Sequence, residues 1–427
     1  MSLSSDTRLP ETRLPETRLD ALSARIVRRD ESFFARDMHA AAPELSAMIA
    51  GARILFIGGA GSIGFQTLRS IARFGPKALH VVDHNENALA ELVRTLRSSG
   101  NPVPVDELLT MPIDYGGDPF RLWLKAQPQP YDYVLNFAAL KHVRSEKDPY
   151  SILAMLDTNV LKLAGLSGQL ADHAGLKRLF CVSTDKAANP SSMMGATKRL
   201  MEHAMFSQRL DWPEGLAITS ARFANVAFSN GSLLQSWGNR LALRQPMACP
   251  EGCRRFFVAL PESGHLCTLA GMLGETGNIL VPSLDPEDHL MLLQDVAGWF
   301  LEAQGLTPHY TRDEAEATGR VEELAAQGCW PVLLTPLDTA GEKPFEEFVG
   351  ANESVHPTRF ASLRRVPYLA PADPSSFPDL LDHLAAVMGS KGDRPLTGGD
   401  LKAAISRVEE SFARTHVASS KSLDQRI

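Results

Sequence analysis

The chain has little cysteine, no long apolar run and no excess of positive charge. Its 427 residues include only five cysteines, and this odd, small number favours reduced thiols over a disulfide framework. The sequence contains no run of ~18 apolar residues, the length that a membrane helix needs, and its polar start lacks the apolar segment of a signal peptide. A net charge of −7 leaves no basic surplus for nucleic-acid phosphates. We therefore expect a cytoplasmic protein that binds neither membranes nor nucleic acid.

The remaining composition is that of a globular protein, with 44% hydrophobic and 22% charged residues. The length allows two or three domains, or one large domain with appendages. Cys249 and Cys253 enclose three residues, but no histidine or cysteine pair nearby completes a zinc spacing. We therefore expect no metal site.

Apolar strands alternate with helical patterns from about residue 53 onward. Strand signals occur over residues 53–57, 79–83, 133–137 and 179–183. Helical patterns separate them, including a long one near 151–174. This alternation predicts a doubly wound parallel α/β sheet of the Rossmann type, with helices on both faces. Such sheets bind ligands at the carboxyl ends of their strands.

The pattern divides the chain into five parts. Residues 7–19 repeat a five-residue unit with Pro10 and Pro15 in successive copies, which prevents a continuous helix. We predict a flexible repeat tail (1–20), an N-terminal helical extension (21–50), a dinucleotide-binding domain (51–223), a smaller substrate-binding region (224–366) with a strand near 277–282 that returns to the sheet, and a C-terminal helical extension (367–427).

A glycine-rich turn follows the first strand. Gly58, Gly61 and Gly64 in the segment GGAGSIG (58–64) stand between a strand and a helix. There they permit a tight turn, the close approach of a pyrophosphate and close packing of the helix. The helix N-terminus then offers unpaired N–H groups to phosphates. The spacing predicts a dinucleotide site, with Ser62 and Ile63 inside the loop.

An acidic residue narrows the choice of dinucleotide. Asp83 closes the second strand, 19 residues after Gly64, where a carboxylate accepts from ribose hydroxyls and repels a 2′-phosphate. This favours NAD as the cofactor, and NADP stays possible. Asp114, after the third strand signal, either contacts adenine or is a solvated loop residue. Ala138 and Ala139, after the fourth strand, are the remaining predicted cofactor contacts.

Polar residues also follow the strand at 179–183. The segment Ser183-Thr184-Asp185-Lys186 should lie at the carboxyl edge of the sheet, with Lys198 on the next helix. An acid beside a base suits proton transfer, whereas the same two residues on a surface form an ion pair worth about 0–1 kcal/mol. The two interpretations stay open on these residues alone.

Three segments carry a resemblance to a known family. They are VLNFAALKHVRSEKDP (134–149), FCVSTDKAANPSSMMGATKRLMEH (180–203) and SARFANVAFSNGS (220–232). They resemble the polysaccharide-biosynthesis branch of the extended short-chain dehydrogenases, whose dehydratases act on UDP-N-acetylglucosamine. CRRFFVALPES (253–263) and TAGEKPFEEF (339–348) continue the resemblance, which covers roughly residues 50–365.

The resemblance implies a 4,6-dehydratase acting on a nucleotide-diphosphate sugar. Such an enzyme oxidises C4 of the sugar, removes the C5 proton, expels the C6 hydroxyl as water and returns the hydride to C6. The family pattern implies Asp185 as the acid, Lys186 as the base, Thr184 as a partner of the C4 oxygen and Lys198 as a partner of the nicotinamide ribose. As a base, Lys186 needs its pKa lowered, and as an acid Asp185 needs the opposite shift.

Met194 departs from the usual pattern of this superfamily. Short-chain dehydrogenases carry Tyr-x-x-x-Lys on this helix, and Met194 stands at the tyrosine position ahead of Lys198. A thioether cannot accept the C4 hydroxyl proton, so Thr184, Asp185 or a water must accept it. The family includes a methionine branch associated with retention of configuration at C5, which implies a retaining reaction here.

The substrate diphosphate should attract cations and polar donors. Arg255 is the strongest expectation, with an ion pair to Glu262 as the alternative. His142, beside Lys141, is also a candidate substrate contact, and a local hydrogen bond is a more plausible role for it than catalysis. Thr339-Ala340 replaces a common Arg-Pro, and Ala224 a common glycine, so the nucleotide stays open. The family pattern implies substrate contacts from Lys141, Arg222, Asn225, Ser229, Ser232, Arg254 and Arg255.

Two other functions compete with the dehydratase. One is an epimerase or reductase of nucleotide sugars with the same fold and cofactor. The other is a dinucleotide-binding sensor or scaffold without catalysis, which the missing tyrosine favours. In this superfamily the helices near 151–174 and 192–211 commonly pair between subunits, so we expect a homo-oligomer, at least a dimer.

Overall fold

The computed structural model describes residues 18–98, 105–141, 146, 148–171, 173, 175–207, 210–390 and 395–417. Residues 1–17 of the predicted tail, and His142, lie outside these ranges. Among the helices described, none combines the length and the apolar character needed to cross a bilayer.

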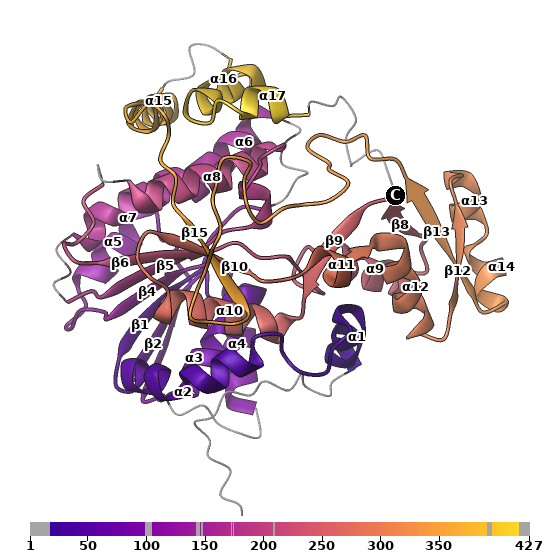
Figure 1. The fold of residues 1–427 in the computed structure, drawn as a ribbon, viewed down its shortest axis with the longest axis horizontal. Helices are drawn as coiled ribbons and strands as arrows, with labels where there is room; N and C mark the ends of the chain where they lie inside the picture. Colours follow the sequence, from indigo (N-terminus) through magenta and orange to yellow (C-terminus); the bar gives the residue numbers. More distant parts are fainter. Residues whose placement is uncertain are drawn as a thin grey trace, which may run out of the picture.

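A large sheet forms the centre of the molecule (Figure 1). In the described chain its order is β14-β15-β10-β6-β5-β4-β1-β2-β3. The strands from β10 to β3 run parallel, and β15 and β14 are antiparallel at one edge. The predicted strand near 277–282 is β10 and pairs with β6. The strands are β1 (Arg53–Ile57), β2 (Ala78–Val82), β3 (Glu107–Met111), β4 (Tyr133–Asn136), β5 (Arg178–Val182), β6 (Ala217–Ala221), β10 (Asn278–Pro282), β14 (His356–Pro357) and β15 (Leu363–Pro367).

Helices cover both faces of this sheet (Figure 1). Successive side chains of β1 enter different cores: Ile54 and Phe56 pack on one face, Leu55 and Ile57 on the other, as the two-residue period of a strand requires. The predicted doubly wound α/β class is confirmed. One face carries α2 (Ala35–Ile49), α3 (Ser62–Ala72), α4 (Glu86–Ser98) and α10 (Leu260–Leu273); the other carries α5 (Asp118–Lys125), α6 (Pro149–Leu156), the π-helical η2 (Asp157–Leu161), α7 (Lys162–Leu170) and α8 (Met193–Phe206).

A smaller region with its own core lies beside the carboxyl edge of the sheet (Figure 1). It holds two three-stranded sheets, ordered β11-β9-β7 and β12-β13-β8. Helix α1 packs on α12 and β9, so the N-terminal segment joins this region to the main sheet. The elements are α1 (Arg18–Val27), β7 (Asn225–Val226), α9 (Leu233–Ala242), β8 (Met247–Pro250), β9 (Arg254–Val258), α11 (Pro286–His289), β11 (Leu290–Leu292), α12 (Leu293–Glu302), β12 (Thr307–Thr311), α13 (Glu314–Gly319), α14 (Val321–Ala326) and β13 (Cys329–Thr335).

The C-terminal helices form an outer layer, drawn in yellow in Figure 1. They are α15 (Ser376–Gly389), α16 (Gly398–Val408) and α17 (Phe412–Thr415). Helix α16 contacts α6 and α8, and α15 contacts η2. Leu384 and Ile405 join the same apolar core as Ile152 and Met155 of α6. The helices expected to pair between subunits therefore carry, on part of their surface, the chain's own C-terminal helices.

Candidate active site

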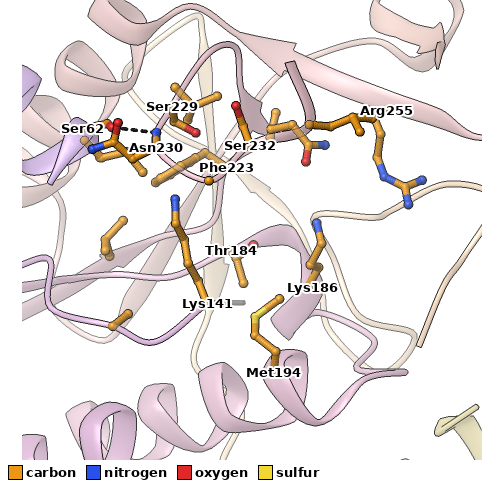
Figure 2. A pocket seen from close by; sticks show the side chains of 18 of the residues that line it. Ser62, Lys141, Thr184, Lys186, Met194, Phe223, Ser229, Asn230, Ser232 and Arg255 are labelled. Carbon is orange, nitrogen blue, oxygen red and sulfur yellow. Dashed lines mark hydrogen bonds between the residues drawn. The ribbon is translucent and has the colours of Figure 1, made fainter. Parts of the chain in front are cut away.

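A cleft of about 450 Å³ opens at the carboxyl edge of the central sheet. Its walls come from the glycine-rich turn after β1, the segments after β4 and β5, the start of α8 and the smaller region (Figure 2). This is where an open parallel sheet places its ligands, because the loops that follow its strands diverge there. Among the described residues, no group of three or more His, Cys, Asp or Glu side chains is arranged to hold a metal ion.

The glycine-rich turn is shaped to hold a phosphate group. Gly58 has φ +69, and a Cβ atom there would lie 2.4 Å from the backbone nitrogen of Ala138. A Cβ at Gly64 would lie 2.8 Å from the carbonyl oxygen of Gly58. Helix α3 begins at Ser62 with Gly61 as its N-cap, and Ser62, Ile63 and both flanking glycines line the cleft. Free N–H groups at this N-terminus favour an anion.

Asp83 supports the glycine-rich turn. Its carboxylate accepts hydrogen bonds from the backbone nitrogens of Ala60, at 3.2 Å, and Asn85, at 3.0 Å. It is buried behind the turn and does not line the described cleft wall, so the ribose contact stays a prediction. The alternative of a loop aspartate is favoured for Asp114, whose half-exposed carboxylate pairs with Lys162 at 2.5 Å. Ala139 lines the cleft.

Asp185 is buried, and its neighbours in the sequence, Thr184 and Lys186, line the cleft. It begins η3 (Asp185–Ala187), a single 3₁₀ turn after β5. Its Oδ1 accepts from the Thr184 hydroxyl at 2.8 Å, the Lys186 backbone nitrogen at 2.9 Å and the Lys186 ammonium at 3.2 Å. Its Oδ2 is buried without a hydrogen-bond partner among the described residues. Since a buried carboxylate oxygen normally finds a donor, this unpaired atom can take up a proton.

Lys186 lies between two carboxylates. Its Nζ is 3.2 Å from Asp185 Oδ1 and 3.7 Å from Glu346 Oε1. Burial alone would lower the pKa of the Lys186 ammonium, but Asp185 and Glu346 outweigh burial, so the pKa lies above its ordinary value. To act as a base from the start, Lys186 would need a lowered pKa, and it does not have one. The requirement stated from the sequence is not met here, because Asp185 and a second carboxylate, Glu346, both favour the ammonium.

Glu346 is a site residue that the sequence reasoning missed. Its buried carboxylate faces three cations, with Lys186 at 3.7 Å, Arg255 at 3.9 Å and Lys343 at 4.0 Å. Burial raises its pKa. The residue stands inside TAGEKPFEEF (339–348), so that segment contained a signal. Its pairing with Lys186 depends on a fold that joins positions 160 residues apart, which no local spacing reveals.

Helix α8 brings Met194 and Lys198 to the cleft. Lys198 Nζ donates to the Val182 carbonyl at 2.6 Å and lies 3.0 Å from Met201 Sδ. Burial, with a further contribution from nearby Lys141, lowers the pKa of Lys198 to about 8. The Met194 backbone nitrogen donates to Glu146 Oε1 at 3.1 Å. Glu146 therefore caps the helix that presents both residues, a role the sequence reasoning also missed.

Polar residues of the opposite wall come mainly from the smaller region. Ser232 is the N-cap of α9, and its Oγ accepts from the Gln235 nitrogen at 3.3 Å. Lys141 reaches into the cleft (Figure 2). The residue as a whole is exposed, but the surrounding protein removes water from its ammonium group and so lowers the pKa of Lys141. Arg254 is exposed outside the described cleft wall. The predicted substrate residues that line the cleft are Lys141, Asn225, Ser229, Ser232 and Arg255.

Arg255 does not make the alternative ion pair with Glu262. Its NH1 donates to the carbonyls of Arg254, at 2.8 Å, and Lys343, at 3.1 Å, while NH2 faces Glu346. Glu262 instead binds Arg29, with Nε–Oε1 at 2.6 Å. The guanidinium of Arg255 is held by carbonyls at the rim of the cleft, where it can meet an anion.

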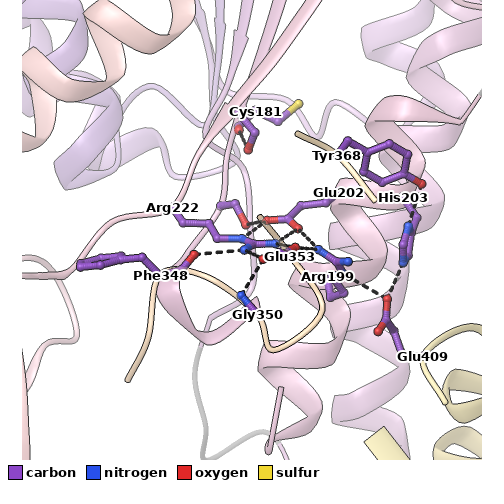
Figure 3. Close-up of polar contacts among 12 residues, drawn as sticks. Cys181, Arg199, Glu202, His203, Arg222, Phe348, Gly350, Glu353, Tyr368 and Glu409 are labelled. Carbon is purple, nitrogen blue, oxygen red and sulfur yellow. Dashed lines mark hydrogen bonds and ion pairs between the residues drawn. The ribbon is translucent and has the colours of Figure 1, made fainter. Parts of the chain in front are cut away.

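Arg222 lies outside the cleft, in a buried network of charges (Figure 3). It donates to both oxygens of Glu202, at 2.8 and 2.7 Å, to both oxygens of Glu353, at 2.5 and 2.8 Å, and to the Phe348 carbonyl at 3.1 Å. Its five N–H donors are all used. The substrate contact expected of Arg222 is therefore wrong, because no donor is left for a ligand.

Comparison with known proteins gives family and fold. A model of the family "Polysaccharide biosynthesis protein" matches residues 54–367. The probable polysaccharide biosynthesis protein EpsC of Bacillus subtilis (strain 168) is 27% identical over 312 residues, which are 73% of this chain and 47% of EpsC. The capsular polysaccharide biosynthesis protein CapD of Staphylococcus aureus is 30% identical over 53% of this chain and 37% of CapD. The chain thus spans about half, or less, of the length of these curated relatives.

A solved structure shares the fold. The X-ray structure of Pen from Bacillus thuringiensis superposes with a TM-score of 0.60 at 19% identity, over 79% of this chain and 98% of Pen. That likeness concerns the arrangement of the elements alone. Because the family model covers most of the chain, including the glycine-rich turn, the Thr184-Asp185-Lys186 segment and Glu346, this protein belongs to the polysaccharide biosynthesis protein family.

Proposed function

We propose that the chain is an NAD-dependent 4,6-dehydratase of a nucleotide-diphosphate sugar, with UDP-N-acetylglucosamine as the first candidate substrate and retention at C5. The observation that carries this proposal is the pair of Lys186, which lines one cleft with the glycine-rich turn, and the buried Asp185 that binds it at 3.2 Å. A protein that only binds a dinucleotide has no need of an acid and a base at that edge. The names of relatives concern polysaccharide synthesis, which fits a sugar nucleotide as substrate.

The residues present fit a dinucleotide. The turn at Gly58 and Gly64 leaves space that a Cβ atom would fill, and the N-terminus of α3 faces it with Ser62 in the wall. Asp83 would favour NAD over NADP, and Lys198 would hold the nicotinamide ribose. The chemistry that NAD supplies when bound is the reversible uptake of a hydride from the sugar.

The residues on the other wall would hold the nucleotide sugar. Arg255 and Lys141 provide cations for the diphosphate, and Ser229, Ser232 and Asn225 provide polar contacts. Thr184 would hydrogen-bond the C4 oxygen. Asp185 would protonate the C6 hydroxyl from Oδ2, because Oδ1 already accepts three hydrogen bonds. Lys186 would remove the C5 proton and return it to the same face, which retains the configuration.

The test is incubation of the purified protein and NAD with UDP-, GDP-, CDP- and dTDP-sugars, followed by mass spectrometry. We expect a product lighter by one water from at least one substrate, with no net consumption of NAD. A product of unchanged mass and inverted C4 would instead identify an epimerase, and net oxidation of NADH a reductase. If none of the sugar nucleotides reacted, the result would favour a dinucleotide-binding protein without catalytic activity.

A matched variant tests the assignment of the base. Lys186→Ala should lose the elimination by a factor on the order of 10²–10⁴ and still retain NAD, because Lys186 does not touch the glycine-rich turn. Loss of bound NAD from this variant would contradict the role given to Lys186. A measured preference for NADP would contradict the role given to Asp83.

A further inference from the structure

The missing tyrosine leaves one proton without an acceptor. Oxidation at C4 releases the proton of the C4 hydroxyl, and Met194, at the tyrosine position on α8, has no group that accepts it. Thr184 and Lys186 line the cleft near Met194 (Figure 2), and the buried Asp185 between them in the sequence is hydrogen-bonded to both. Lys186 is held as an ammonium by its two carboxylate neighbours, so it cannot accept a proton first.

Thr184 and Asp185 are already joined by a hydrogen bond. The Thr184 hydroxyl donates to Asp185 Oδ1 at 2.8 Å, a normal length for an O–H···O contact. The hydroxyl oxygen keeps lone pairs that can accept from a sugar hydroxyl. Asp185 Oδ2 is buried and has no partner within the described chain. The side chains therefore form a chain with an acceptor face at Thr184 and an empty site at the far oxygen of Asp185.

We propose that Thr184 and Asp185 form a proton relay that replaces the tyrosine, and that the proton which Thr184 passes to Asp185 during oxidation at C4 is the one that leaves in water. This inference rests on the proposed function. The C4 hydroxyl gives its proton to Thr184 Oγ1 while Thr184 passes its own proton to the Asp185 carboxylate, and the C4 hydride leaves with the bond electrons for the oxidised cofactor. Asp185, now a carboxylic acid, later gives that proton to the C6 hydroxyl, and the C6–O bond breaks to release water.

The balance of the reaction closes without any other donor or acceptor from solvent. The departing water is the C6 hydroxyl plus the proton that Thr184 passed to Asp185; Thr184 is left with the former C4 hydroxyl proton, and the hydride moves from C4 to C6. Asp185 begins and ends as a carboxylate. Before the reaction, therefore, Asp185 can be a carboxylate and Lys186 an ammonium. The mechanism does not require a protonated Asp185 beside a neutral Lys186 at that stage.

The relay also accounts for the order of the steps. While Asp185 is a carboxylate, it and Glu346 hold the pKa of Lys186 above its ordinary value. Once Asp185 takes up a proton, one of these two negative charges is gone, and Lys186 releases its proton more readily. Glu346 Oε1, 3.7 Å from Lys186 Nζ, is the nearest remaining carboxylate to receive it. Lys186 then accepts the C5 proton only after C4 is oxidised. It returns this proton to C5 and afterwards takes back from Glu346 the proton that it released.

The decisive experiment compares Asp185→Asn with Lys186→Ala after mixing with the substrate that the wild-type protein dehydrates. If Asp185 only protonated C6, Asp185→Asn would still oxidise C4, and reduced cofactor would accumulate at 340 nm absorbance (~one equivalent per site, since later steps are blocked). The relay predicts that Asp185→Asn loses this absorbance change by about 10²–10⁴-fold in rate, whereas Lys186→Ala, blocked after oxidation, retains it. Accumulation in Asp185→Asn at the wild-type rate would overturn the relay.

Two further measurements keep the relay separate from misfolding and from the proposed function. Thr184→Val should lose C4 oxidation and Thr184→Ser should recover most of it, since serine restores the hydroxyl; equal rates for both variants would overturn the relay.

Infrared difference spectra of Lys186→Ala should gain a protonated carboxylic-acid band on substrate addition, and no such band would equally overturn it. A wild-type protein that dehydrates no sugar nucleotide would instead defeat the proposed function itself.

Discussion

Two clusters of buried charge meet at the end of β5, and they differ in how fully their atoms are paired. In the network around Arg222 and Glu202 (Figure 3), the arginine donates five hydrogen bonds and both carboxylate oxygens are filled. Around Lys186, which lines the cleft (Figure 2), Asp185 Oδ2 has no partner among the described residues, and Glu346 faces the lysine at 3.7 Å. Charged groups whose hydrogen-bonding atoms are all paired stabilise the fold, whereas charged groups with an unpaired atom can take part in a reaction.

The two clusters are joined by one hydroxyl group. Ser183 Oγ donates to Glu202 Oε1 at 2.6 Å, and the next residues along the chain are Thr184 and Asp185. Burial would raise the pKa of Glu202, but Arg222 and Arg199 outweigh it and lower the pKa to about 2. The network therefore stays charged at any pH at which the protein works, and it provides a fixed base for the reactive segment.

The largest expected difference in stability is between variants of Arg222 and Arg254, two arginines that the sequence predicted to contact the substrate. Arg222→Met should lower the free energy of unfolding by about 3–5 kcal/mol, because it leaves Glu202 and Glu353 buried without their main partner. Arg254→Met, at an exposed arginine, should change it by less than about 0.5 kcal/mol. Urea denaturation of both variants measures the difference. Equal stabilities would mean that the network does not support the fold.

Isosteric changes of two buried carboxylates give the next largest contrast. Glu202→Gln should cost about 1.5–3 kcal/mol of stability, because it weakens charge-assisted hydrogen bonds to two arginines. Asp185→Asn should cost about 1 kcal/mol or less, because an amide oxygen still accepts from Thr184 and the changed atom loses no partner. Thermal and urea unfolding at pH 7 check this pair. A larger loss for Asp185→Asn would reverse the interpretation of the two clusters.

A smaller effect is expected at the link between the clusters. Ser183→Ala removes one of several donors to Glu202, so stability should fall by about 1 kcal/mol. Ser183→Thr, which keeps the hydroxyl, is the matched control. Unfolding curves and the rate of the proposed dehydration are to be measured on both. If Ser183→Ala changed neither quantity, the network and the reactive segment would be independent.

The smallest change in stability is expected at Glu346, where the measured quantity is a pKa. Glu346→Gln removes one of the two carboxylates that raise the pKa of Lys186, so that pKa should fall and Lys186 should be neutral at a lower pH. The pH at which Lys186 becomes reactive toward an acylating reagent, followed by peptide mass spectrometry, reports this shift. Glu347→Gln, next in sequence, should leave it in place. An unchanged profile in Glu346→Gln would exclude Glu346 as a partner of Lys186.

The elements of the main sheet could be predicted from sequence because their signals are local. The apolar run 53–57, the glycine spacing after it and the polar residues after 179–183 each depend on neighbours in the chain. Arg222 could not be assigned this way. Its position at the end of β6 is that of a ligand-binding residue, and only its partner Glu353, 131 residues later, shows its role.

The smaller region and Glu346 were less predictable for related reasons. The irregular pattern between about 228 and 275 contains the short strands β8 (MACP) and β9 (RRFFV), whose proline and arginines interrupt the apolar run that marks the strands of the main sheet. A base at Lys186 needs a lowered pKa, and the sequence alone could not show whether burial or neighbouring charge decides that pKa. Its upward shift depends on the adjacent Asp185 and on Glu346 from a distant segment, and distant pairs are what a single sequence does not encode locally.

The C-terminal layer imposes an order of events during synthesis. Helix α8 carries Arg199 and His203, whose partners Glu353 and Glu409 follow them by 154 and 206 residues. At a synthesis rate of about 5–20 residues per second, the second partner emerges on the order of 10–40 s after the helix. Until then His203 lacks its carboxylate partner, and Arg199 has only Glu202, three residues later on the same helix, to offset its burial. The helix that carries Met194 and Lys198 is therefore among the last parts of the molecule to settle, and a nascent chain released before Glu409 lacks the anchor for its reactive edge.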